Sequence, residues 1–310
     1  MKKVVLILAT IEDTQSLYMQ KKLYKLGYSS VIVDSRIFPE NVNLTYDINP
    51  LMNGYISFND AKDKIDLSDI VGIYYRVVKG ILKPNEEDTL LKNVVHLNNE
   101  AYFNSFLQML NHCNWVNSPE SIINHQKKPY QLQLLKQEGI LIPETYITND
   151  IEFVNKKFNQ GDKQFIFKPV RGWANTELLT KEMLEQEDSS GLLKRTPITL
   201  QEYIKGENLR IYVIGENVFP VKINTKDIDS RESSDNVHEK TELPEEIVDA
   251  CIKVTKTLNF AYSAIDMIKT ANDQYYLLEA NATPIFLNDE LSLGYPISDK
   301  ICELLVKTHK

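Results

Sequence analysis

The sequence predicts an α/β fold with α+β character in its C-terminal part, and three observations support this. Residues 1–112 alternate short apolar runs with helix-like segments, which is the pattern of α/β lobes. Beyond residue 197, apolar strands follow one another through turn residues, which predicts a mixed or antiparallel sheet. The chain has 310 residues, 43% of them hydrophobic, and this is enough for about two or three structural lobes.

The first lobe, residues 1–112, is predicted to hold three strands and two helices. Asp13 can cap a helix that runs to Leu26, and Gly27 is suited to end it. Asn85 precedes three acidic residues, which the positive end of a helix dipole favours, so a second, long helix is expected to begin there with Asn85 as its cap. The expected strands are Val4–Ala9, Val31–Val33 and Ile70–Val77.

A second lobe begins where the chain turns around Asn114–Pro119. A helix is expected over Lys128–Glu138, because leucines line one face of this segment and a glycine follows it. The short strand Phe165–Lys168 comes next, and Pro169–Asn175 is expected to be a loop.

The third section is predicted to be rich in strands. Gly215-Glu216-Asn217 is a good turn between two apolar segments, which predicts a hairpin. Thr225–Glu242 is polar without a period and is expected to be a mobile surface loop, after which Pro244 begins a helix. The expected strands are Ile198–Ile204, Arg210–Ile214, Val218–Asn224, Tyr262–Ile268 and Gln274–Ala280, and the expected last helix is Ser298–Val306.

Composition argues against several classes of partner and location. The formal net charge is −8 and no cluster of lysines and arginines stands out, so nucleic acid is not expected as a partner. The first apolar run, Val4–Ala9, is too short for a signal peptide, and no apolar run approaches the roughly 20 residues of a membrane span. Cys113, Cys251 and Cys302 form no CxxC pair and are expected to be buried free thiols, which predicts a cytoplasmic location.

Two apolar strands near the C-terminus carry the clearest chemical signal. If Asn272–Asp273 forms a two-residue hairpin turn, Asp266 lies directly opposite Glu279, with Cβ atoms about 5 Å apart. Asn281 then lies on the same face as Glu279. Two carboxylates at this distance repel by roughly 3 kcal/mol at an effective dielectric near 20. A divalent cation would relieve the repulsion, and these oxygen donors suit Mg²⁺ held together with nucleotide phosphates.

A structural alternative stays open for this pair, because a bulge or a longer loop would shift the register and turn one acid to solvent. Two lysines support the phosphate hypothesis. Lys168 ends an apolar strand, where its ammonium needs an anion, and Lys128 opens a helix within reach of a second phosphate. Taken alone, each lysine is better explained as a solvated surface residue.

The strand after residue 197 is a candidate for nucleotide recognition. Its backbone donors and acceptors lie beside aliphatic side chains, which suits the edge of an adenine ring, and Glu207 is expected to bind the ribose hydroxyls. Arg210 and Lys222 are expected on adjacent strands of the next hairpin, both facing the phosphates. An ordinary strand and turn would give a similar pattern. The remaining candidate nucleotide contacts are Gln201, Glu202, Tyr203 and Ile204.

In order and spacing, these candidates resemble the nucleotide site of the ATP-grasp superfamily over about Asn117–Ile297. Within that superfamily, the sequence looks closest to RimK-type ligases and to the macrocyclases of ribosomal peptides, the graspetide or microviridin-type ligases. The stretch from Leu243 through Asp266 is similar to the helix and the metal-bearing strand of those peptide ligases. Tyr74-Tyr75-Arg76 resembles their Tyr-Arg-Arg element, with Val77 in place of the second arginine.

The resemblance implies an ATP-grasp fold, in which a pre-ATP-grasp lobe precedes central and C-terminal lobes that clasp ATP. The corresponding lobes in this sequence are residues 1–112, 113–197 and 198–310. ATP and two Mg²⁺ ions are implied as cofactors. The phosphates would be bound by the residues that match Lys128 and Lys168. The metal ions would be ligated by the residues that match Asp266, Glu279 and Asn281.

The sequence departs from the family pattern at three places. The phosphate-covering loop is normally rich in glycine, whereas Pro169–Asn175 contains only Gly172. Microviridin-type ligases often carry Asp-Trp-Arg where Asp235-Asn236-Val237 stands here. Their Gly-Gln-Trp after the metal-binding asparagine is replaced by residues 282–286, Ala-Thr-Pro-Ile-Phe. The last two departures indicate a different peptide substrate or a different substrate class.

The resemblance also implies a carboxylate ligase that acts through an acyl phosphate. Arg76 and Arg171 are candidates for holding the carboxylate, and Arg76 joins Arg210 and Lys222 as a candidate catalytic residue. Three functions stay open: crosslinking of a precursor peptide made of a leader and a core, ligation of a small-molecule carboxylate or amine as RimK-type enzymes do, and nucleotide binding without ligase activity. The three metal-type residues argue against the last function. The oligomeric state, including a homodimer, is open.

Overall fold

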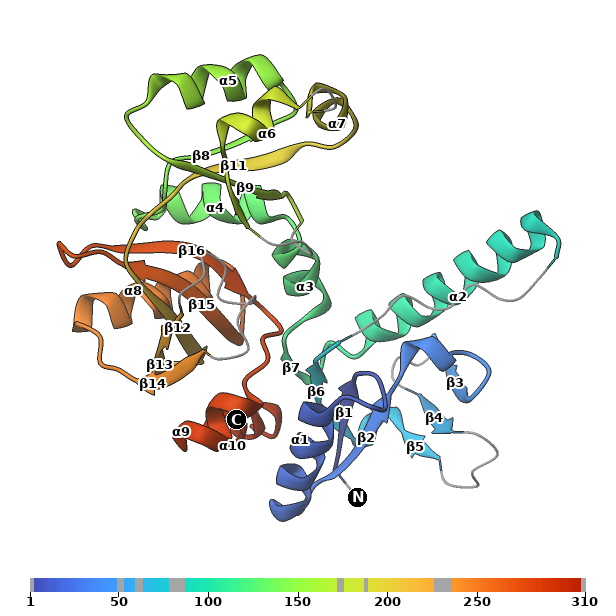
Figure 1. The fold of residues 1–310 in the computed structure, drawn as a ribbon. Helices are drawn as coiled ribbons and strands as arrows, with labels where there is room; N and C mark the ends of the chain where they lie inside the picture. The colour runs from blue at the N-terminus through green and yellow to red at the C-terminus, as the bar shows by residue number, and fades with distance from the viewer. Residues whose placement is uncertain are drawn as a thin grey trace. The chain divides into compact units, whose positions relative to one another are not determined.

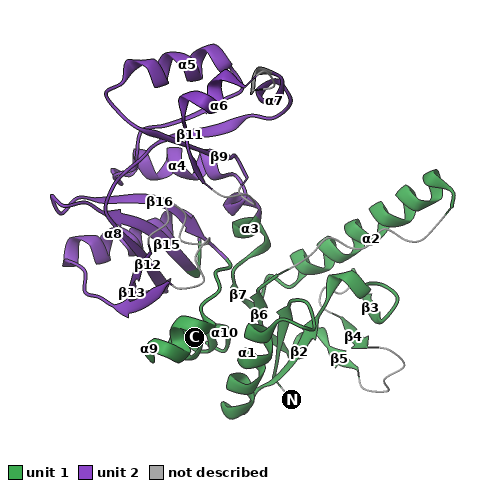
Figure 2. Ribbon diagram, viewed as in Figure 1, with its two compact units in different colours: residues 1–122, 260–262, 283–310 green, residues 123–259, 263–282 purple. Residues whose placement is uncertain are grey.

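The computed structural model describes residues 3–48, 53–58, 64–77, 87–171, 176–186, 189–225 and 236–307. The chain divides into two compact units (Figure 2). Unit 1 comprises residues 1–122, 260–262 and 283–310, and unit 2 comprises residues 123–259 and 263–282. The C-terminal segment after residue 282 therefore clusters with the N-terminal part of the chain. The division of the second unit into a central and a C-terminal lobe stays a prediction.

Unit 1 is built on a parallel four-stranded sheet with the order β2-β1-β6-β7 (Figure 1). Its central strand β1 is buried along its whole length, which explains why its sequence is a continuous apolar run. The segment around Asn114, expected as a turn, contributes the edge strand β7. The strands are β1 (Val4–Leu8), β2 (Ser29–Val33), β6 (Ile70–Tyr75) and β7 (Asn114–Val116).

Helices pack against this sheet. As expected, Asp13 caps the first helix, since its carboxylate accepts a hydrogen bond from the Ser16 backbone at 2.8 Å, and Gly27 follows the helix with φ of 84°. The second helix is capped by Asp88, which accepts from the Leu90 backbone at 2.7 Å, whereas Asn85 lies outside the described residues. The helices of unit 1 are α1 (Thr14–Lys25), α2 (Thr89–Met109), α9 (Leu287–Leu293) and α10 (Ile297–Leu305). Helix α3 (Pro119–His125) begins in unit 1 and ends in unit 2.

The C-terminal helix α10 packs against α1, β6 and β7 within unit 1. Gly72 on β6 permits this close approach, because a Cβ atom there would lie 2.3 Å from the backbone oxygen of Leu305. Most of the inward face of α10 is buried, including Ile301 and Leu305. The last helix was expected over Ser298–Val306 and is confirmed.

A second, antiparallel sheet in unit 1 was not expected from the sequence. It has the order β3-β4-β5, and its residues Val42, Leu44 and Ile56 join the same apolar core as β1 and β6. Its strands and the two adjoining 3₁₀ turns are β3 (Val42–Tyr46), β4 (Gly54–Phe58), β5 (Ile65–Asp66), η1 (Ser35–Ile37) and η2 (Leu67–Asp69).

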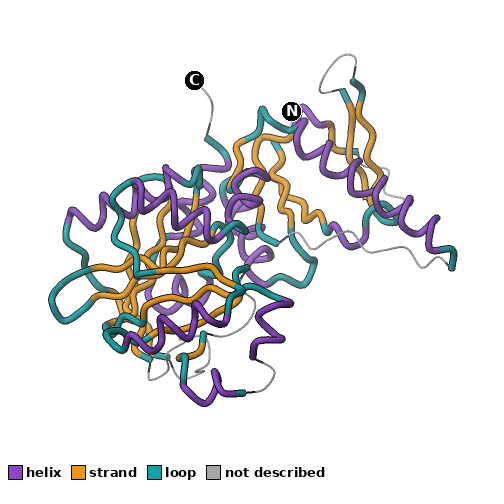
Figure 3. Tube along the Cα trace, turned by 90° about the horizontal axis from the view of Figure 1, so that it is seen from above, coloured by secondary structure: helices purple, strands orange, loops and turns teal. Residues whose placement is uncertain are grey.

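Unit 2 contains two sheets, flanked by helices (Figure 3). The first has the order β10-β9-β11-β8 and the second the order β14-β13-β12-β15-β16. The first sheet is formed by β8 (Thr145–Thr148), β9 (Phe165–Pro169), β10 (Glu177–Leu178) and β11 (Ile198–Glu202). The second is formed by β12 (Glu207–Ile214), β13 (Asn217–Asn224), β14 (Val237–Lys240), β15 (Tyr262–Lys269) and β16 (Tyr275–Asn281).

Strand β14 corrects the expectation of a loop over Thr225–Glu242. Residues 226–235 lie outside the described residues, but Val237–Lys240 pairs with the edge of β13. Three of its four residues are exposed, so the segment carries no apolar pattern by which a strand is recognised.

The helices of unit 2 cover the two sheets. Val154 and Leu193 join Phe165 and Leu200 in the core beneath the first sheet, and Cys251 and Val254 are buried on the helix that packs against the second. The expected helix over Lys128–Glu138 is confirmed. The helices are α4 (Lys128–Gln137), α5 (Ile151–Gln160), α6 (Lys181–Glu185), α7 (Ser189–Arg195) and α8 (Glu245–Thr257).

Two expectations from composition can be compared with the structure. All three cysteines are buried and free of disulfide bonds. Within the described part of the chain, none of the helices has the length and apolar character that crossing a membrane requires.

Candidate active site

The predicted acidic pair lies on the β15–β16 hairpin of unit 2. Asp266 is the direct cross-strand partner of Glu279, as expected. Asn281 lies on the same face, and its Nδ2 donates a hydrogen bond to Glu279 Oε1 at 2.9 Å. The hairpin therefore collects two carboxylates and one amide on one side of the sheet.

The register that produces this pairing differs from the expected one. The turn is a three-residue loop, 271–273, closed by the Thr270 N–H donating to Gln274 O at 2.9 Å and with Asp273 at φ of 57°. Near the turn, the pairing is consequently shifted by one residue from the predicted register, so that Lys269 pairs with Tyr275. A bulge at Leu278 removes the offset before Glu279. The prediction of a two-residue turn was wrong, but the bulge restores the predicted pairing of Asp266 with Glu279.

Cations of unit 2 hold the acidic pair together. Arg210 on β12 binds Asp266 through two hydrogen bonds, with Nε–Oδ1 at 2.8 Å and Nη2–Oδ2 at 3.0 Å. Lys128 Nζ lies 3.4 Å from Glu279 Oε2 and donates to Asn281 Oδ1 at 3.1 Å. Each carboxylate thus faces a different cation, which offsets the repulsion that the sequence predicts.

These contacts set the charge state of the cluster. Burial alone would raise the pKa of Glu279, but the ammonium groups of Lys128 and Lys168 outweigh it and hold the pKa at about 2. The Asp266 carboxylate raises the pKa of Arg210 further above its usual range, against the effect of burial. Both groups are therefore fully charged at neutral pH.

Lys168 completes the cluster from the first sheet. Its Nζ donates to Gln201 Oε1 at 3.1 Å, and the buried Gln201 side chain is in turn fixed by a 2.9 Å bond to Thr145 Oγ1. A small cavity between α4, β9 and β16 is lined by Lys128, Lys168 and Glu279. The structure thus brings the two predicted phosphate lysines and a predicted metal ligand around one cavity.

The candidate adenine segment forms the end of β11 and the turn into β12. Gly206 packs against β15, because a Cβ there would lie 2.2 Å from Lys269 O. Two backbone donors of this segment bond within the unit: the Glu202 N–H bonds to Glu144 O and the Tyr203 N–H bonds to Gln164 O, each at 2.8 Å. Adenine recognition by this segment stays a prediction, and it would have to use other backbone groups, such as those of Ile204.

The structure does not bring Lys222 to the predicted place. In the β12–β13 ladder Lys222 pairs with Leu209, whereas Arg210 pairs with Val221, so the side chains of Arg210 and Lys222 point to opposite faces. Lys222 Nζ instead contacts Glu207 Oε1 at 2.5 Å. The expectation that both cations face one site is wrong, because the two-residue turn at Gly215-Glu216 fixes a register that separates them.

The two candidate carboxylate-binding arginines lie in different units. Arg76 is buried in unit 1, where its Nη1 donates to Thr283 O at 3.2 Å and its Nη2 lies 3.4 Å from Asp13 Oδ1. Its Nε is a buried donor that lacks a hydrogen-bond partner among the described residues. Arg171 belongs to unit 2, and its Nη2 donates to Gln126 Oε1 at 2.8 Å.

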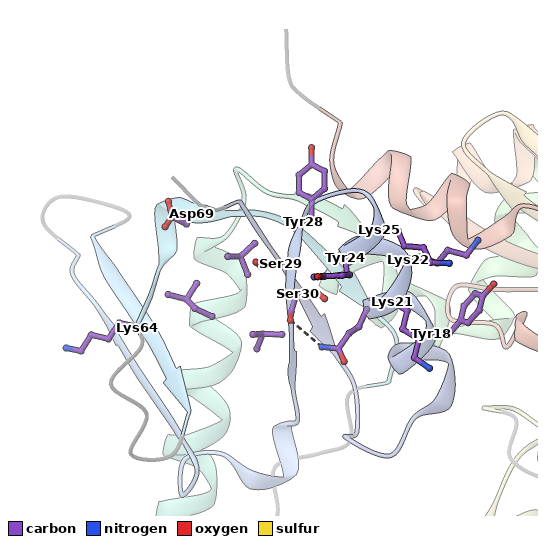
Figure 4. A pocket seen from close by; sticks show the side chains of 14 residues that line it. Tyr18, Lys21, Lys22, Tyr24, Lys25, Tyr28, Ser29, Ser30, Lys64 and Asp69 are labelled. Carbon is purple, nitrogen blue, oxygen red and sulfur yellow. Dashed lines mark hydrogen bonds between the residues drawn. The ribbon is translucent and has the colours of Figure 1, made fainter.

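A second, more open pocket runs along the edge strand β2 in unit 1 (Figure 4). Among the residues that line it are Lys21 and Tyr24 on α1, Ser30 on β2 and Tyr28 in the turn between these two elements. Gln20 Nε2 donates to Ser30 O at 3.3 Å across it. None of the predicted site residues lines this pocket.

Comparison with known protein families identifies both parts of the chain. Residues 126–284, just over half of the chain, match the family model described as ATP-grasp domain. This chain belongs to the ATP-grasp family. Residues 4–123 match the model described as MvdD pre-ATP grasp domain.

The ATP-grasp chain is similar to characterised ligases in sequence. It is 25% identical over 196 residues to the alpha-aminoadipate–LysW ligase LysX of Sulfurisphaera tokodaii, covering 59% of this chain and 68% of LysX. It is 26% identical over 209 residues to human N-acetylaspartylglutamate synthase A, covering 62% of this chain and 53% of that protein. The chain thus spans only about half the length of the human relative.

Solved structures share its ATP-grasp fold over nearly the whole length. The macrocyclase MdnC bound with precursor peptide MdnA, from Microcystis aeruginosa MRC, superposes with a TM-score of 0.85 at 25% identity, covering 99% of this chain and 100% of MdnC. The ATP-grasp ligase PsnB, complexed with minimal precursor, Mg and ADP, gives a TM-score of 0.81 at 24% identity, covering 98% of this chain and 96% of PsnB.

The ATP-grasp fold binds ATP together with Mg²⁺, and the donor set of this chain fits that cofactor pair. Asp266, Glu279 and Asn281 offer only oxygen ligands toward a metal, which is the set that Mg²⁺ prefers. Among the residues that the structure describes, no group of three or more His, Cys, Asp or Glu side chains forms a separate metal-type cluster. The neighbouring lysines are suited to phosphate oxygens.

Two residues of this ATP-grasp site were not foreseen from the sequence. Gln131 on α4 is buried, and its side-chain amide bonds to both backbone groups of Ala280. His125 Nδ1 lies 3.2 Å from Ala280 O, and burial followed by the Lys128 charge lowers its pKa to about 4. Gln131 follows Lys128 by three positions, so both lie on one face of α4, and this spacing was the signal available in the sequence.

Proposed function

We propose that this chain is an ATP-dependent carboxylate ligase that forms ester or amide bonds between side chains of a ribosomally made precursor peptide. The observation that carries the proposal is the cluster of Asp266, Glu279 and Asn281 beside Lys128 and Lys168 in an ATP-grasp fold. That donor set is suited to Mg²⁺, and those lysines are suited to a triphosphate. We also propose two ions, because the acidic pair offers more oxygen atoms than one ion sharing phosphate ligands requires.

The proposed reaction proceeds in two balanced steps. A substrate carboxylate oxygen attacks the γ-phosphorus of ATP, the bond from that phosphorus to the β,γ-bridging oxygen breaks, and ADP leaves. A hydroxyl or amine then attacks the acyl phosphate, inorganic phosphate leaves with the electron pair of the C–O bond, and the attacking group loses its proton. The peptide loses one water for each bond, and ATP becomes ADP and phosphate.

The chain's own residues have distinct roles in this proposal. Lys128 and Lys168 bind phosphate oxygens and neutralise charge that develops on the leaving ADP. Arg210 fixes the Asp266 carboxylate through two bonds, so that its orientation is defined before substrates bind. Bound Mg²⁺ supplies Lewis-acid stabilisation of the phosphate oxygens. Gln201 holds Lys168 toward the cavity.

The N-terminal unit is proposed to bind the carboxylate substrate through Arg76. Its guanidinium lies at the carboxyl end of the parallel sheet, where ligands of α/β folds bind. The buried Nε without a described partner supports this role, since buried donors are normally paired. Arg171 is the alternative carboxylate ligand. Catalytic participation of Lys222 is no longer favoured, because its ladder position turns it away from Arg210.

A precursor peptide is favoured as the substrate. The fold of the chain matches MdnC, which was solved with its precursor peptide MdnA, along its whole length and including the pre-ATP-grasp part. The sequence relatives favour a second candidate, a ligase that joins an amino acid or small amine to a carboxylate in the manner of LysX and of N-acetylaspartylglutamate synthase.

A coupled assay of ADP release distinguishes these functions. ADP release stimulated by a Thr- and Glu-rich peptide, with the peptide losing the mass of one water per bond, supports the peptide ligase. ADP release that requires a free amino acid supports the second candidate. Nucleotide binding without acceptor-dependent ADP release would mean that the chain is a binding module and would refute the proposal.

A homodimer and a cytoplasmic location complete the proposal. The first half of α2 exposes Leu90, Val94 and Leu97, with exposed fractions of 73%, 46% and 62%. Together with the exposed Ala101 they are spaced by four, three and four residues, which is the spacing of a two-helix seam. Three buried free thiols and a need for ATP support the cytoplasm.

A further inference from the structure

The side chain of Gln131 pairs with the backbone of the metal-binding strand. Its Nε2 donates to Ala280 O at 3.1 Å, and the Ala280 N–H donates to its Oε1 at 3.2 Å. Gln131 is only 2% exposed. The amide thus makes the same two bonds to Ala280 that a neighbouring strand would make.

The position of Ala280 explains why such a partner is needed. Strand β16 is an edge strand of its sheet, and it pairs on one side with β15. Both backbone groups of Ala280 bond to Gln131 and therefore point away from β15. Because backbone groups alternate in direction along a strand, those of Glu279 and Asn281 are expected to point toward β15. Gln131 therefore fixes the strand at the one residue between two proposed metal ligands.

Other groups share the same carbonyl. Ala280 O also lies 3.3 Å from Lys128 Nζ and 3.2 Å from His125 Nδ1. In the proposed function Lys128 also binds phosphate oxygens, so a bound triphosphate would draw its ammonium away from Ala280 O. Gln131 is uncharged and buried, so its two bonds are independent of whether a nucleotide is present.

We propose that Gln131 is a positioning residue for the metal site: it holds the Ala280 peptide groups so that Glu279 and Asn281 keep their oxygens on one face when Lys128 moves to the nucleotide. This inference rests on the proposed function for the identity of the bound cation. Residues that orient metal ligands in this way typically contribute about 10- to 100-fold in metal affinity.

The test compares Mn²⁺ binding, measured by electron paramagnetic resonance in the presence of ADP, in the wild type and in Gln131→Met. Methionine keeps the side-chain volume and removes both bonds. The matched control is Gln15→Met in unit 1. Gln15 is equally buried, and its amide also bonds to two backbone groups, Pro284 O at 3.3 Å and the Phe286 N–H at 2.8 Å.

We expect Gln131→Met to bind Mn²⁺ about 10- to 100-fold more weakly than the wild type, whereas Gln15→Met loses thermal stability but keeps wild-type Mn²⁺ affinity. Equal Mn²⁺ affinity in all three proteins overturns the inference. A wild type that binds neither Mn²⁺ nor ADP overturns the proposed function instead, so the two failures are distinguishable.

Amide hydrogen exchange keeps the inference testable if Gln131→Met does not fold. In the wild type, the Ala280 amide is expected to exchange slowly both without ligands and with Mn²⁺ and ADP, because Gln131 holds it in both states. Fast exchange of this amide, at the rate of an exposed edge strand, would show that Gln131 does not fix the strand.

Discussion

Lys128 and Glu279 form an ion pair at the position where a divalent cation is proposed to bind. Lys128 Nζ lies 3.4 Å from Glu279 Oε2 and 3.1 Å from Asn281 Oδ1, so the ammonium occupies oxygens that would otherwise face the metal. From the neighbouring strand β12, Arg210 occupies both oxygens of Asp266. The protein's own cations thus stabilise the acidic pair before any ligand binds.

Replacement of Glu279 by Gln separates catalysis from folding. The amide keeps the shape of the side chain but removes the negative charge, so metal binding is weakened and Lys128 and Lys168 lose the carboxylate that they face. We expect turnover to fall by at least about 100-fold and the melting temperature to fall, while the variant stays folded at the assay temperature. An ADP-release assay and scanning calorimetry measure the two quantities. A variant with wild-type turnover at saturating Mg²⁺ would exclude Glu279 as a ligand.

Replacement of Lys128 by Met should change two affinities in opposite directions. Without nucleotide, Mn²⁺ no longer competes with an ammonium for Glu279 and Asn281, and binding tightens by about tenfold, or about 1.4 kcal/mol. ATP binding weakens, because one phosphate contact is lost. Lys127→Met is the matched control, since the Lys127 side chain is exposed and its Nζ donates to Oδ1 of the neighbouring Asn124 at 3.2 Å. If both affinities fall together, Lys128 does not occupy the metal position.

The fold was more predictable than the site, and particular residues show why. Continuous apolar runs, caps and glycines identified β1, α1, α4 and α8 within a few residues. The sheet β3-β4-β5 was missed although Val42 and Leu44 alternate with the exposed Asn43 and Thr45, because the run is only five residues long. Periodicity does not reveal a strand such as β14, in which three of the four residues are exposed.

The site depended on register, which sequence determines only through turns and bulges. The Asp266–Glu279 pairing was right although the turn was wrong, since the bulge at Leu278 restores the offset of the three-residue loop. The Arg210–Lys222 prediction had no such compensation and was wrong by one position. Gln131 was missed because its spacing from Lys128 places it on the same face of α4 but does not identify its partner, which is a backbone peptide.

Acid should destabilise the ligand-free protein through His125. Burial, and then Lys128, lowers its pKa from 6.5 to about 4, so the unfolded chain binds a proton before the folded one. Stability from this group is present above about pH 6.5 and is lost as the pH falls toward 4, on the order of 3 kcal/mol in total. The low pKa of Glu279 adds a further loss below about 4.5. Calorimetry from pH 8 to 4 measures the stability of the wild type and of His125→Asn. The stability of the variant should depend less on pH between 6.5 and 4. Parallel curves of stability against pH for the two proteins would contradict the prediction.

The exposed seam of α2 predicts the oligomeric state. Leu97→Glu places a charge at the centre of this seam, and we expect it to weaken the dimer by at least about tenfold. Asn99→Glu is the control, because two positions further on the side chain lies on the other side of the helix. Sedimentation velocity measures the mass of each protein. A wild type that remains monomeric at about 100 μM would refute the homodimer.

Arg76→Lys should affect the carboxylate substrate and leave the nucleotide unaffected. Lysine keeps the charge near Asp13 but loses the planar fork, including the buried Nε that lacks a described partner. We therefore expect KM for the carboxylate-bearing acceptor to rise about 10- to 100-fold, while KM for ATP, whose proposed contacts all lie in unit 2, changes by less than about threefold. Arg36→Lys controls for disruption of an arginine–carboxylate pair in unit 1, since Arg36 binds Asp34 and Glu12 there. Steady-state kinetics with each substrate varied in turn separate the two constants. A rise in KM for ATP alone would assign Arg76 to the nucleotide, and unchanged constants would leave Arg171 as the carboxylate ligand.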